Sequence, residues 1–517
     1  MQHPQSHEEV DPSRVSLLED GVEPGVWRYA KAERVSVIID AADYFVHMQQ
    51  AMLKAQNRIL LIGWDFDTRI HLSAGRRWFE KGLKRTYPSR LGSFFVWVVR
   101  KRKGLEIKIL KWSFGVFKLV IRSSMWADLL RWWPHKQIDF KFDNAHPVGC
   151  SHHQKIVVLD NRLAVCGGID MTIKRWDDRE HLPENPHRTT PGGRAYGPWH
   201  DATMMMEGDV ADALAELGED RWTSAGGEAL KDVPVRTDSL WPERLPVQFE
   251  NVEIGISRTR ACYRDWDQVR EIEHLFNEHI ARAKRFIYAE SQYFASRVIG
   301  EAVLRRLEEA DPPEIVIVHP AHADGWLEQQ AMDHARAQLV RTIEAADHKN
   351  RFSLWMPFTG ETAIYVHAKI LIVDDEVFRI GSANMNNRSL GLDSECDVSI
   401  DCDRPANGHC APVIAGLRHS LLGEHCGVAQ DDVAAWIEQA GSMQAFIEQA
   451  AIQPGVRRTL KRYRAPQLSG VELKLAESAL LDPERPEDLF EPYAKGGLFR
   501  DGTHLKRMRD RLRRRQS

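Results

Sequence analysis

Hydrophobic and polar positions follow one another along the chain in blocks that predict helices and strands. Residues 43–57 carry apolar side chains at intervals of three and four, which predicts an amphipathic helix, and the apolar run over residues 58–64 has the length of a buried strand. Further strands are predicted over residues 106–111 and 314–319 and from Ile138 and Phe352, and later helices over residues 413–425 and 431–451. This succession predicts a mixed sheet flanked by helices.

The same pattern occurs twice. Residues 54–66, KAQNRILLIGWDF, align with residues 282–294, RAKRFIYAESQYF, and each segment precedes one copy of the motif H-x-K-x-x-x-x-D. In both copies a predicted strand, IDFKF or FSLWM, begins fifteen residues before the histidine of the motif. We therefore predict an α/β fold of two similar α/β/α domains with mixed sheets, packed with pseudo-twofold symmetry, plus a helical C-terminal extension.

Composition shifts along the chain give the expected domain boundaries. Residues 224–250 are polar and rich in Pro and Gly, which is typical of a linker. We expect an N-terminal arm over residues 1–34, a first catalytic domain over 35–223, the linker, a second catalytic domain over 251–427 and a helical extension with a basic tail over 428–517.

Overall composition narrows the function classes. With 43% hydrophobic and 28% charged residues, the 517-residue chain is typical of a globular protein, and its net charge of −4 disfavours a surface built for duplex nucleic acid. Seven scattered cysteines without C-x-x-C spacing predict neither a zinc cluster nor a disulfide framework. We see no apolar run of membrane-spanning length and no N-terminal signal, so we expect a cytoplasmic protein or one peripheral to a membrane. Export by a route without such a signal stays open.

The chemistry-bearing residues are concentrated in the repeated motif. The first copy contains His153, Lys155 and Asp160, and the second contains His367, Lys369 and Asp374. In both copies a glycine follows the aspartate after seven residues, and Asp170 or Asn384 lies three residues beyond that glycine. A single H-x-K is usually a surface pair, but two matched copies predict one shared site.

Two imidazoles and two ammonium groups in one pocket predict a phosphate site. Alternate residues of an extended segment face the same side, so each histidine can share a pocket with the lysine two residues on. The lysines would neutralise the oxygens of a phosphodiester, and Asp170 and Asn384 would hold those oxygens or the lysines. One imidazole can attack phosphorus while the other protonates the leaving alcohol. Because HExxH, Asp-rich and Walker-type motifs are missing from the sequence, we expect neither a metal nor another cofactor.

Each histidine needs an acceptor for its second ring nitrogen. Asp177 or Asp178, and Glu395, are the candidates, since they follow their histidines by similar distances. Asp160 and Asp374 belong to the catalytic motif, but their places directly after short apolar runs favour a turn-forming role.

Two further pairs of residues stand outside the motif. We expect His200 and Asp201 to form a structural hydrogen-bonded pair rather than to act in catalysis. Gln292 and Tyr293 stay open between the wall of the pocket and the core.

These motifs carry a family resemblance over residues 35–427. Several segments resemble the phospholipase D superfamily, and specifically its eukaryotic-type members. They are the adjacent His152 and His153, GGID with RWDDREH, PWHD at residues 198–201, IYAESQYF, and YVHAKILIVDD with IGSANMNNRS. The resemblance implies a metal-free phosphohistidine mechanism with His153 as nucleophile and His367 as acid. Gly168 and Asp170 replace the Ser and Asn of the general pattern, as in the eukaryotic type. Only about 34 residues precede the similarity, so we expect no lipid- or calcium-targeting module and no calcium dependence.

The leading hypothesis is a phospholipid phosphodiesterase that releases the head group to give phosphatidic acid, with transfer of the phosphatidyl group to an alcohol as a further outcome. The alternatives are a phosphatidyltransferase of the cardiolipin-synthase type, a metal-independent nuclease and a non-catalytic lipid-binding module. The expected partner is a phospholipid membrane surface, which the basic and aromatic segment 76–133 and the basic tail could contact. We expect no nucleic-acid partner, no transmembrane segment and a monomer, since both half-sites are in one chain.

Overall fold

The first repeat forms a mixed sheet. The computed structural model describes residues 24–72, 87–112, 123–322 and 326–466. The strands of the first repeat pair in the order β4-β3-β2-β5-β6-β8-β1, and β2, β3 and β4 are mutually parallel. These strands are β1 (Arg28–Ile39), β2 (Arg58–Gly63), β3 (Glu106–Trp112), β4 (Ile138–Asp143), β5 (Ile156–Leu159), β6 (Leu163–Gly167) and β8 (Ala202–Glu207).

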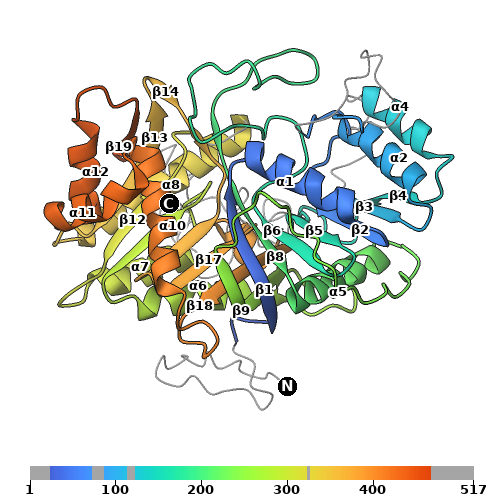
Figure 1. Cartoon of the computed structure of the whole chain (residues 1–517). Helices are drawn as coiled ribbons and strands as arrows, with labels where there is room; N and C mark the ends of the chain where they lie inside the picture. Colours follow the sequence, from blue (N-terminus) through green and yellow to red (C-terminus); the bar gives the residue numbers. More distant parts are fainter. Residues whose placement is uncertain (1–23, 73–86, 113–122, 323–325, 467–517) are drawn as a thin grey trace, which may run out of the picture.

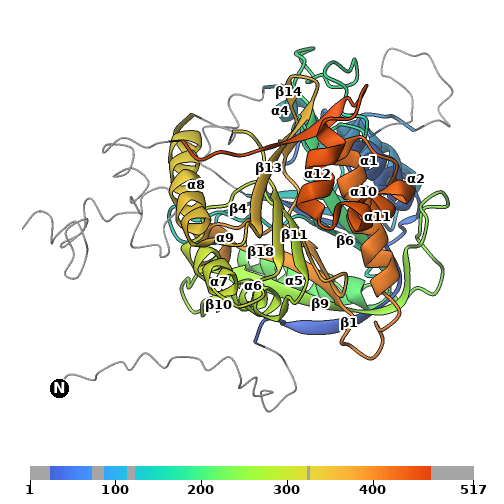
Figure 2. The same ribbon diagram turned by 90° about the vertical axis from the view of Figure 1, so that its left-hand side faces the viewer.

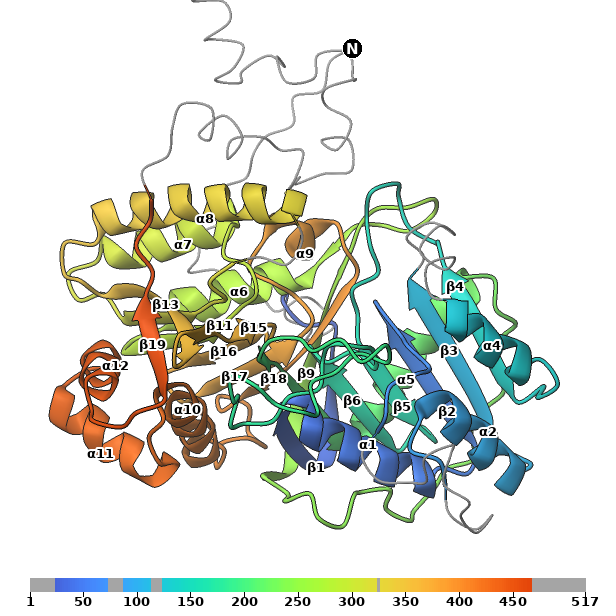
Figure 3. The ribbon, with the colours of Figure 1, turned by 90° about the horizontal axis from the view of Figure 1, so that it is seen from above.

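The second repeat builds the same sheet again. Its strands pair in the order β13-β12-β11-β16-β17-β18-β9, and the strands β11, β12 and β13 are again parallel. They are β9 (Phe249–Arg260), β11 (Phe286–Glu290), β12 (Glu314–Val318), β13 (Phe352–Thr359), β16 (Ile370–Val373), β17 (Val377–Gly381) and β18 (Glu395–Asp401). The strands β1 and β9 pair antiparallel and join the two halves, as Figure 3 shows from above. The predicted fold class, two similar α/β units, is confirmed.

Helices cover both faces of each half. In the first half, α1 (Ala41–Lys54), α2 (Leu91–Lys101) and α4 (Ser123–Trp132) lie on one face and α5 (Asp209–Ser224) on the other (Figure 1). In the second half, α6 (Glu271–Arg282), α7 (Arg297–Leu307) and α8 (Trp326–Ala346) lie opposite α10 (Ala411–Cys426), α11 (Gln430–Ala440) and α12 (Met443–Ala451) (Figure 2). One apolar core lies under each outer helix group, and a third, shared core joins the inner faces of both halves. None of the helices within the described ranges is long and apolar enough to cross a bilayer.

Three details differ from the sequence-based expectations. Residues 28–34, assigned to a loose arm, belong to β1, because their backbone pairs with β9. The helix expected over residues 431–451 is two helices, since Gly441 takes a left-handed conformation and Ser442 caps the second. The described part of the extension also contains a strand, β19 (Arg458–Arg462), which pairs antiparallel with β13. The basic tail and parts of the segment 76–133 lie outside the described residues.

Short pairings between the halves carry the two motifs toward each other. The strand β15 (Tyr365–Val366), just before the second motif, runs parallel to β7 (Trp199–His200) of the first half. On the other side, His152 bridges to Ser394 of the second half. Each motif is therefore attached by backbone hydrogen bonds to the opposite half. The remaining short elements are β10 (Val269–Arg270), β14 (Thr362–Ala363) and α9 (Asn387–Gly391).

Candidate active site

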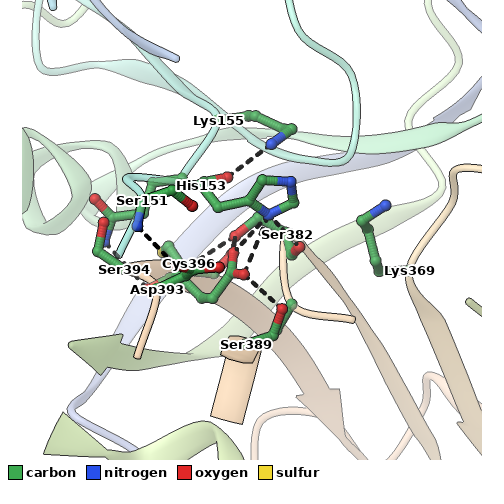
Figure 4. Close-up of polar contacts among 12 residues, drawn as sticks. Ser151, His153, Lys155, Lys369, Ser382, Ser389, Asp393, Ser394 and Cys396 are labelled. Atoms are coloured by element: carbon green, nitrogen blue, oxygen red, sulfur yellow. Dashed lines mark hydrogen bonds and ion pairs between the residues drawn. The ribbon is translucent and has the colours of Figure 1, made fainter. Parts of the chain in front are cut away.

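His153 is held by residues of the second half of the chain. Its backbone N–H donates to the carbonyl of Ser394 at 2.9 Å. Its Nδ1 lies 3.0 and 3.1 Å from the two carboxylate oxygens of Glu395 and 3.0 Å from the carbonyl oxygen of Ser382 (Figure 4). All three oxygens are acceptors, so Nδ1 carries the proton and the lone pair lies on Nε2. Glu395 is fixed in turn by the hydroxyls of Ser382 at 2.5 Å and Ser389 at 2.7 Å.

His367 is held in the same way by residues of the first half. Its backbone N–H donates to the carbonyl of His200 at 2.7 Å, and its Nδ1 lies 2.7 Å from Oδ2 of Asp201. Asp201 directly precedes β8, as Glu395 begins the matching strand β18. Each imidazole is therefore oriented by a carboxylate from the opposite repeat.

The glycines of the motif make room for this arrangement. A Cβ on Gly168 would lie 2.1 Å from Oδ1 of Asp201 and 3.3 Å from the carbonyl oxygen of His367. A Cβ on Gly381 would lie 1.9 Å from Oδ1 of Asp397. These contacts are too close for any side chain, so glycine is required sterically at both positions.

The two lysines lie around the His153 ring in Figure 4. Lys155 donates from Nζ to the carbonyl oxygen of its own His153 at 2.7 Å and lies 3.5 Å from Oδ2 of Asp170. Lys369 donates to the carbonyl oxygen of His367 and to Oε1 of Gln292 at 3.2 Å. Both ammonium groups are thus aimed by the backbone of their own motif.

Burial and mutual repulsion set the charges in the pocket. Burial, together with the positive charges of Lys369, Arg175 and Lys155, holds the pKa of His367 well below its usual range. Burial also lowers the pKa of Lys369, to about 7, although the charge of Asp201 opposes this shift. The same positive charges that disfavour a protonated His367 would attract the negative charge of a bound phosphodiester.

Asp160 and Asp374 are placed as turn-forming residues. Asp160 accepts the backbone N–H groups of residues 56–58, each at 2.7 Å. Asp374 accepts those of residues 284–286 at 2.7–2.8 Å. Each carboxylate thereby fixes the loop between the first helix and the next strand of its half, and within the described residues neither one hydrogen-bonds to His153 or His367.

The comparisons with known proteins agree with this arrangement. A family model described as Phospholipase D matches residues 336–464, a range that includes the second motif. Phospholipase D alpha 1 of Zea mays is 25% identical over 54% of this chain and 49% of its own length. Phospholipase D1 of Saccharomyces cerevisiae is 24% identical over 76% of this chain and 29% of its own length. The chain is therefore similar to the phospholipase D superfamily.

Further comparisons place the fold and the extent of the match. Phospholipase D A of Dictyostelium discoideum is 24% identical over 71% of this chain and 33% of its own length. This chain thus spans half or less of the length of these relatives. The structure of a phosphatidylserine synthase of Haemophilus influenzae superimposes with a TM-score of 0.50 at 11% identity, covering 82% of this chain and 96% of that one, which supports the shared fold.

The structure separates some of the predicted site residues from the histidines. Asp177 accepts from His181 at 2.9 Å and from Arg188 at 2.8 Å, so it does not orient a motif histidine. Asp178 accepts the side-chain N–H of Asn185 at 3.1 Å in the same loop. Asn384 is buried in the position that matches Asp170, and among the described residues its Oδ1 has no hydrogen-bond partner.

The expectation of a structural His200–Asp201 pair is wrong. Asp201 contacts His367, whereas His200 donates away from it, to Glu290 at 2.8 Å. Adjacent residues of an extended segment point to opposite sides, so the two side chains serve different sites. The distance in sequence from histidine to carboxylate did not predict Asp201, because the first half has a long loop over residues 172–198 before it. Its place directly before an apolar strand, which matches that of Glu395, is the better indication.

Other residues of the pocket were left open or missed. Gln292 lies in the pocket wall, where it accepts from Lys369 and donates to the hydroxyl of Tyr365 at 3.0 Å. Trp199 packs on the His367 ring with centroids 5.1 Å apart, and the guanidinium of Arg175 lies 4.3 Å from the Trp199 ring centroid. Trp199 and Arg175 have no counterpart in the spacing of the motif.

Proposed function

We propose that the protein is a phospholipid phosphodiesterase that hydrolyses the head-group ester of glycerophospholipids to phosphatidic acid. The observation that carries the proposal is the crossed pair of histidines, each next to its own lysine and oriented by a carboxylate from the opposite half. The names of the relatives, phospholipase D from a plant, a yeast and an amoeba, supply the substrate class.

In the first step Nε2 of His153 attacks phosphorus. Glu395 holds the Nδ1 proton and stabilises the positive charge that develops on the ring. The bond from phosphorus to the head-group oxygen breaks, and His367 gives its proton to that oxygen, so that the head-group alcohol leaves. The phosphatidyl group is then bound to His153.

His367 must be protonated for that step, although its surroundings in the free pocket disfavour the charged form. The phosphodiester supplies the missing negative charge between Lys155 and Lys369 and thereby raises the pKa of the imidazole. Binding of substrate and loading of the acid are coupled in this way. The assignment of His153 as nucleophile rests on the family resemblance.

In the second step neutral His367 removes a proton from water. The hydroxyl attacks phosphorus, the phosphorus–nitrogen bond breaks, and phosphatidic acid and neutral His153 are released. An alcohol in place of water gives a transphosphatidylation product by the same steps. No step of this scheme uses a metal ion.

An exposed apolar patch supports a membrane surface as the site of action. Trp126, Leu130 and Trp133, on and just after α4, are 43%, 66% and 84% exposed, and the basic residues Arg131 and Lys136 are exposed beside them. Aromatic rings and cations together favour the interface of anionic lipid. Trp132, which the sequence grouped with them, is buried in the core instead.

Head-group release from phosphatidylcholine and phosphatidylethanolamine vesicles tests the function. We expect release by the wild type without added Ca²⁺ or Mg²⁺, complete loss in His153→Gln, and normal release in His187→Gln, which replaces an exposed histidine. Release that requires added divalent cations would contradict the mechanism. Faster cleavage of single-stranded DNA than of lipid at equal enzyme concentration would favour the nuclease alternative.

Trapping of the intermediate tests the assignment of the histidines. His367→Ala lacks both the acid of the first step and the base of the second, so the labelled lipid should carry p-nitrophenol as its leaving group, which departs without a proton. The second step is then blocked, and denatured protein should carry the phosphatidyl group on residue 153. Label on His367 in the reciprocal variant His153→Ala, with none on His153 in the first, would reverse the two roles.

A further inference from the structure

A second cluster of ligating side chains lies outside the catalytic pocket. Asp40, His181, His200 and Glu424 are buried, and one oxygen or nitrogen from each lies within 4.8 Å of all the others. They come from the end of β1, the loop over residues 172–198, β7 and α10, which are far apart in sequence. The catalytic scheme uses none of these four side chains.

Four separations between histidine nitrogens and carboxylate oxygens are close to those around a tetrahedral metal ion. Nε2 of His181 lies 3.3 Å from Asp40 Oδ2 and 3.0 Å from Glu424 Oε1. Nδ1 of His200 lies 3.3 Å from Asp40 Oδ1 and 3.0 Å from Glu424 Oε1. Ligands about 2.0–2.1 Å from a tetrahedral zinc ion lie about 3.3 Å from one another.

Hydrogen bonds account for only part of this cluster, since Nε2 of His181 and Oε1 of Glu424 form one at 3.0 Å. Asp40 Oδ2 and His200 Nδ1 are fully buried, and among the described residues neither atom has a hydrogen-bond partner despite these short separations. Buried polar atoms without a partner are costly, and a metal ion would satisfy both of them.

Each imidazole also has the second acceptor that metal-bound histidines use. The other nitrogen of His181 donates to Asp177 at 2.9 Å, and the other nitrogen of His200 donates to Glu290 at 2.8 Å. A carboxylate behind each histidine fixes the tautomer that aims the free lone pair into the cluster. Asp177 therefore orients His181 and does not orient His153.

With both imidazoles neutral, the carboxylates of the network outnumber the guanidinium groups by two, whereas protonated His181 and His200 would balance them without a metal. Asp40, Asp177, Glu290 and Glu424 contribute four negative charges, and the guanidinium groups that contact them, Arg179 on Glu424 and Arg188 on Asp177, contribute two positive ones. With neutral imidazoles, as metal ligation requires, one divalent cation balances the cluster.

We propose that Asp40, His181, His200 and Glu424 bind one structural Zn²⁺ ion that ties the first half of the chain to helix α10. Two nitrogen and two oxygen donors in a tetrahedral arrangement suit zinc, whereas Ca²⁺ and Mg²⁺ take six or more oxygens. No sequence motif predicts this site, because its ligands are scattered over almost four hundred residues. The ion would not take part in phosphoryl transfer.

Elemental analysis of the purified full-length protein tests the site independently of any enzymatic activity. We expect about one zinc per chain in the wild type, and less than about a fifth of that in Glu424→Gln and His181→Gln. Matched controls are Glu314→Gln and His319→Gln, which replace a buried glutamate and a buried histidine elsewhere in the second half. Both controls should keep the wild-type zinc content.

Since a ligand variant can fail to fold, wild-type protein provides a second measurement. Removal of zinc with dipicolinate should lower Tm by several degrees, and Zn²⁺ but not Mg²⁺ or Ca²⁺ should restore it. Wild-type protein that contains no zinc and takes up none at micromolar Zn²⁺, with Tm unchanged, would overturn the proposal. Stoichiometric binding of calcium in place of zinc would overturn it as well.

Discussion

Replacement of Gly168 by alanine tests the role of Asp201 without altering any chemical group of the site. The new Cβ would lie 2.1 Å from Oδ1 of Asp201, which is about 1.5 Å inside ordinary van der Waals contact. Because the backbone of His367 lies on the other side at 3.3 Å, the carboxylate has to give way, and its 2.7 Å hydrogen bond to His367 is lost or bent.

The size of the effect follows from that hydrogen bond. A hydrogen bond to a charged group contributes about 1.5–3 kcal/mol. At about 1.4 kcal/mol for each factor of ten, kcat for head-group release should fall by about 10- to 100-fold. KM should change little, because the lysines that bind the phosphate are not displaced. Overpacking at this position should also cost about 1–3 kcal/mol of unfolding free energy.

The assay compares kcat and thermal unfolding of Gly168→Ala with those of Gly104→Ala. A Cβ at Gly104 meets no atom within 4 Å, so this control should behave like the wild type. If Gly168→Ala is too unstable to assay, Asp201→Asn removes the charge while keeping the shape, and the same loss of kcat is expected. A kcat within twofold of the wild type in a folded Gly168→Ala or Asp201→Asn protein would refute the role of Asp201.

Three further predictions concern charge and stability. Because the lowered pKa of Lys369 is about 7, this lysine loses its charge as pH rises from 6 to 8.5, and vanadate should inhibit less strongly over that range. Lys369→Arg keeps its charge and should flatten the pH dependence. A steep dependence in the variant would contradict the role of Lys369. Asp374→Ala leaves three backbone amides of residues 284–286 without their acceptor, so Tm should fall by several degrees while kcat of the folded protein stays within about tenfold of the wild-type value. A large loss of kcat with an unchanged Tm would instead make Asp374 catalytic. Burial lowers the pKa of His279 from its ordinary 6.5 to about 3, so the unfolded chain binds this proton first and the free energy of unfolding falls as pH drops below about 6.5. In denaturant titrations, His279→Gln should therefore lose less stability between pH 6.5 and 4 than the wild type. Equal losses would exclude His279 as a cause.

The repeat made the fold predictable from the sequence. Buried strands in parallel arrangement are continuous apolar runs, and the β2 and β11 runs are therefore visible in both halves, as is the matched position of β4 and β13 relative to the histidines. The start of β1 was missed because residues 28–34 alternate polar and apolar side chains only weakly, and their pairing with β9 is more than two hundred residues distant. Gly441 was a visible signal for the break between α11 and α12, and it was overlooked.

The site was predictable only as far as its local pattern extends. The motif places each histidine beside its lysine, since two residues of one extended segment share a side. It says nothing about which half supplies each carboxylate, because that depends on how β7 and β15 pair. Glu395 was found because its distance from His367 suggested a link, yet it contacts His153. Long-range contacts of this kind leave no trace in sequence spacing.

The pairing of β19 with β13 bears on the solubility of shortened versions of this chain. The strand β13 is flanked on its other side by β12, so without β19 its backbone amides and carbonyls along residues 355–359 would form an open edge. Open edges of apolar strands recruit strands from other molecules. A chain cut after α10 would keep both motifs and every proposed zinc ligand, and it would nonetheless expose a template for aggregation. The strand β19 thus protects the edge of β13 from pairing with other molecules, although it contributes no motif residue and no proposed zinc ligand.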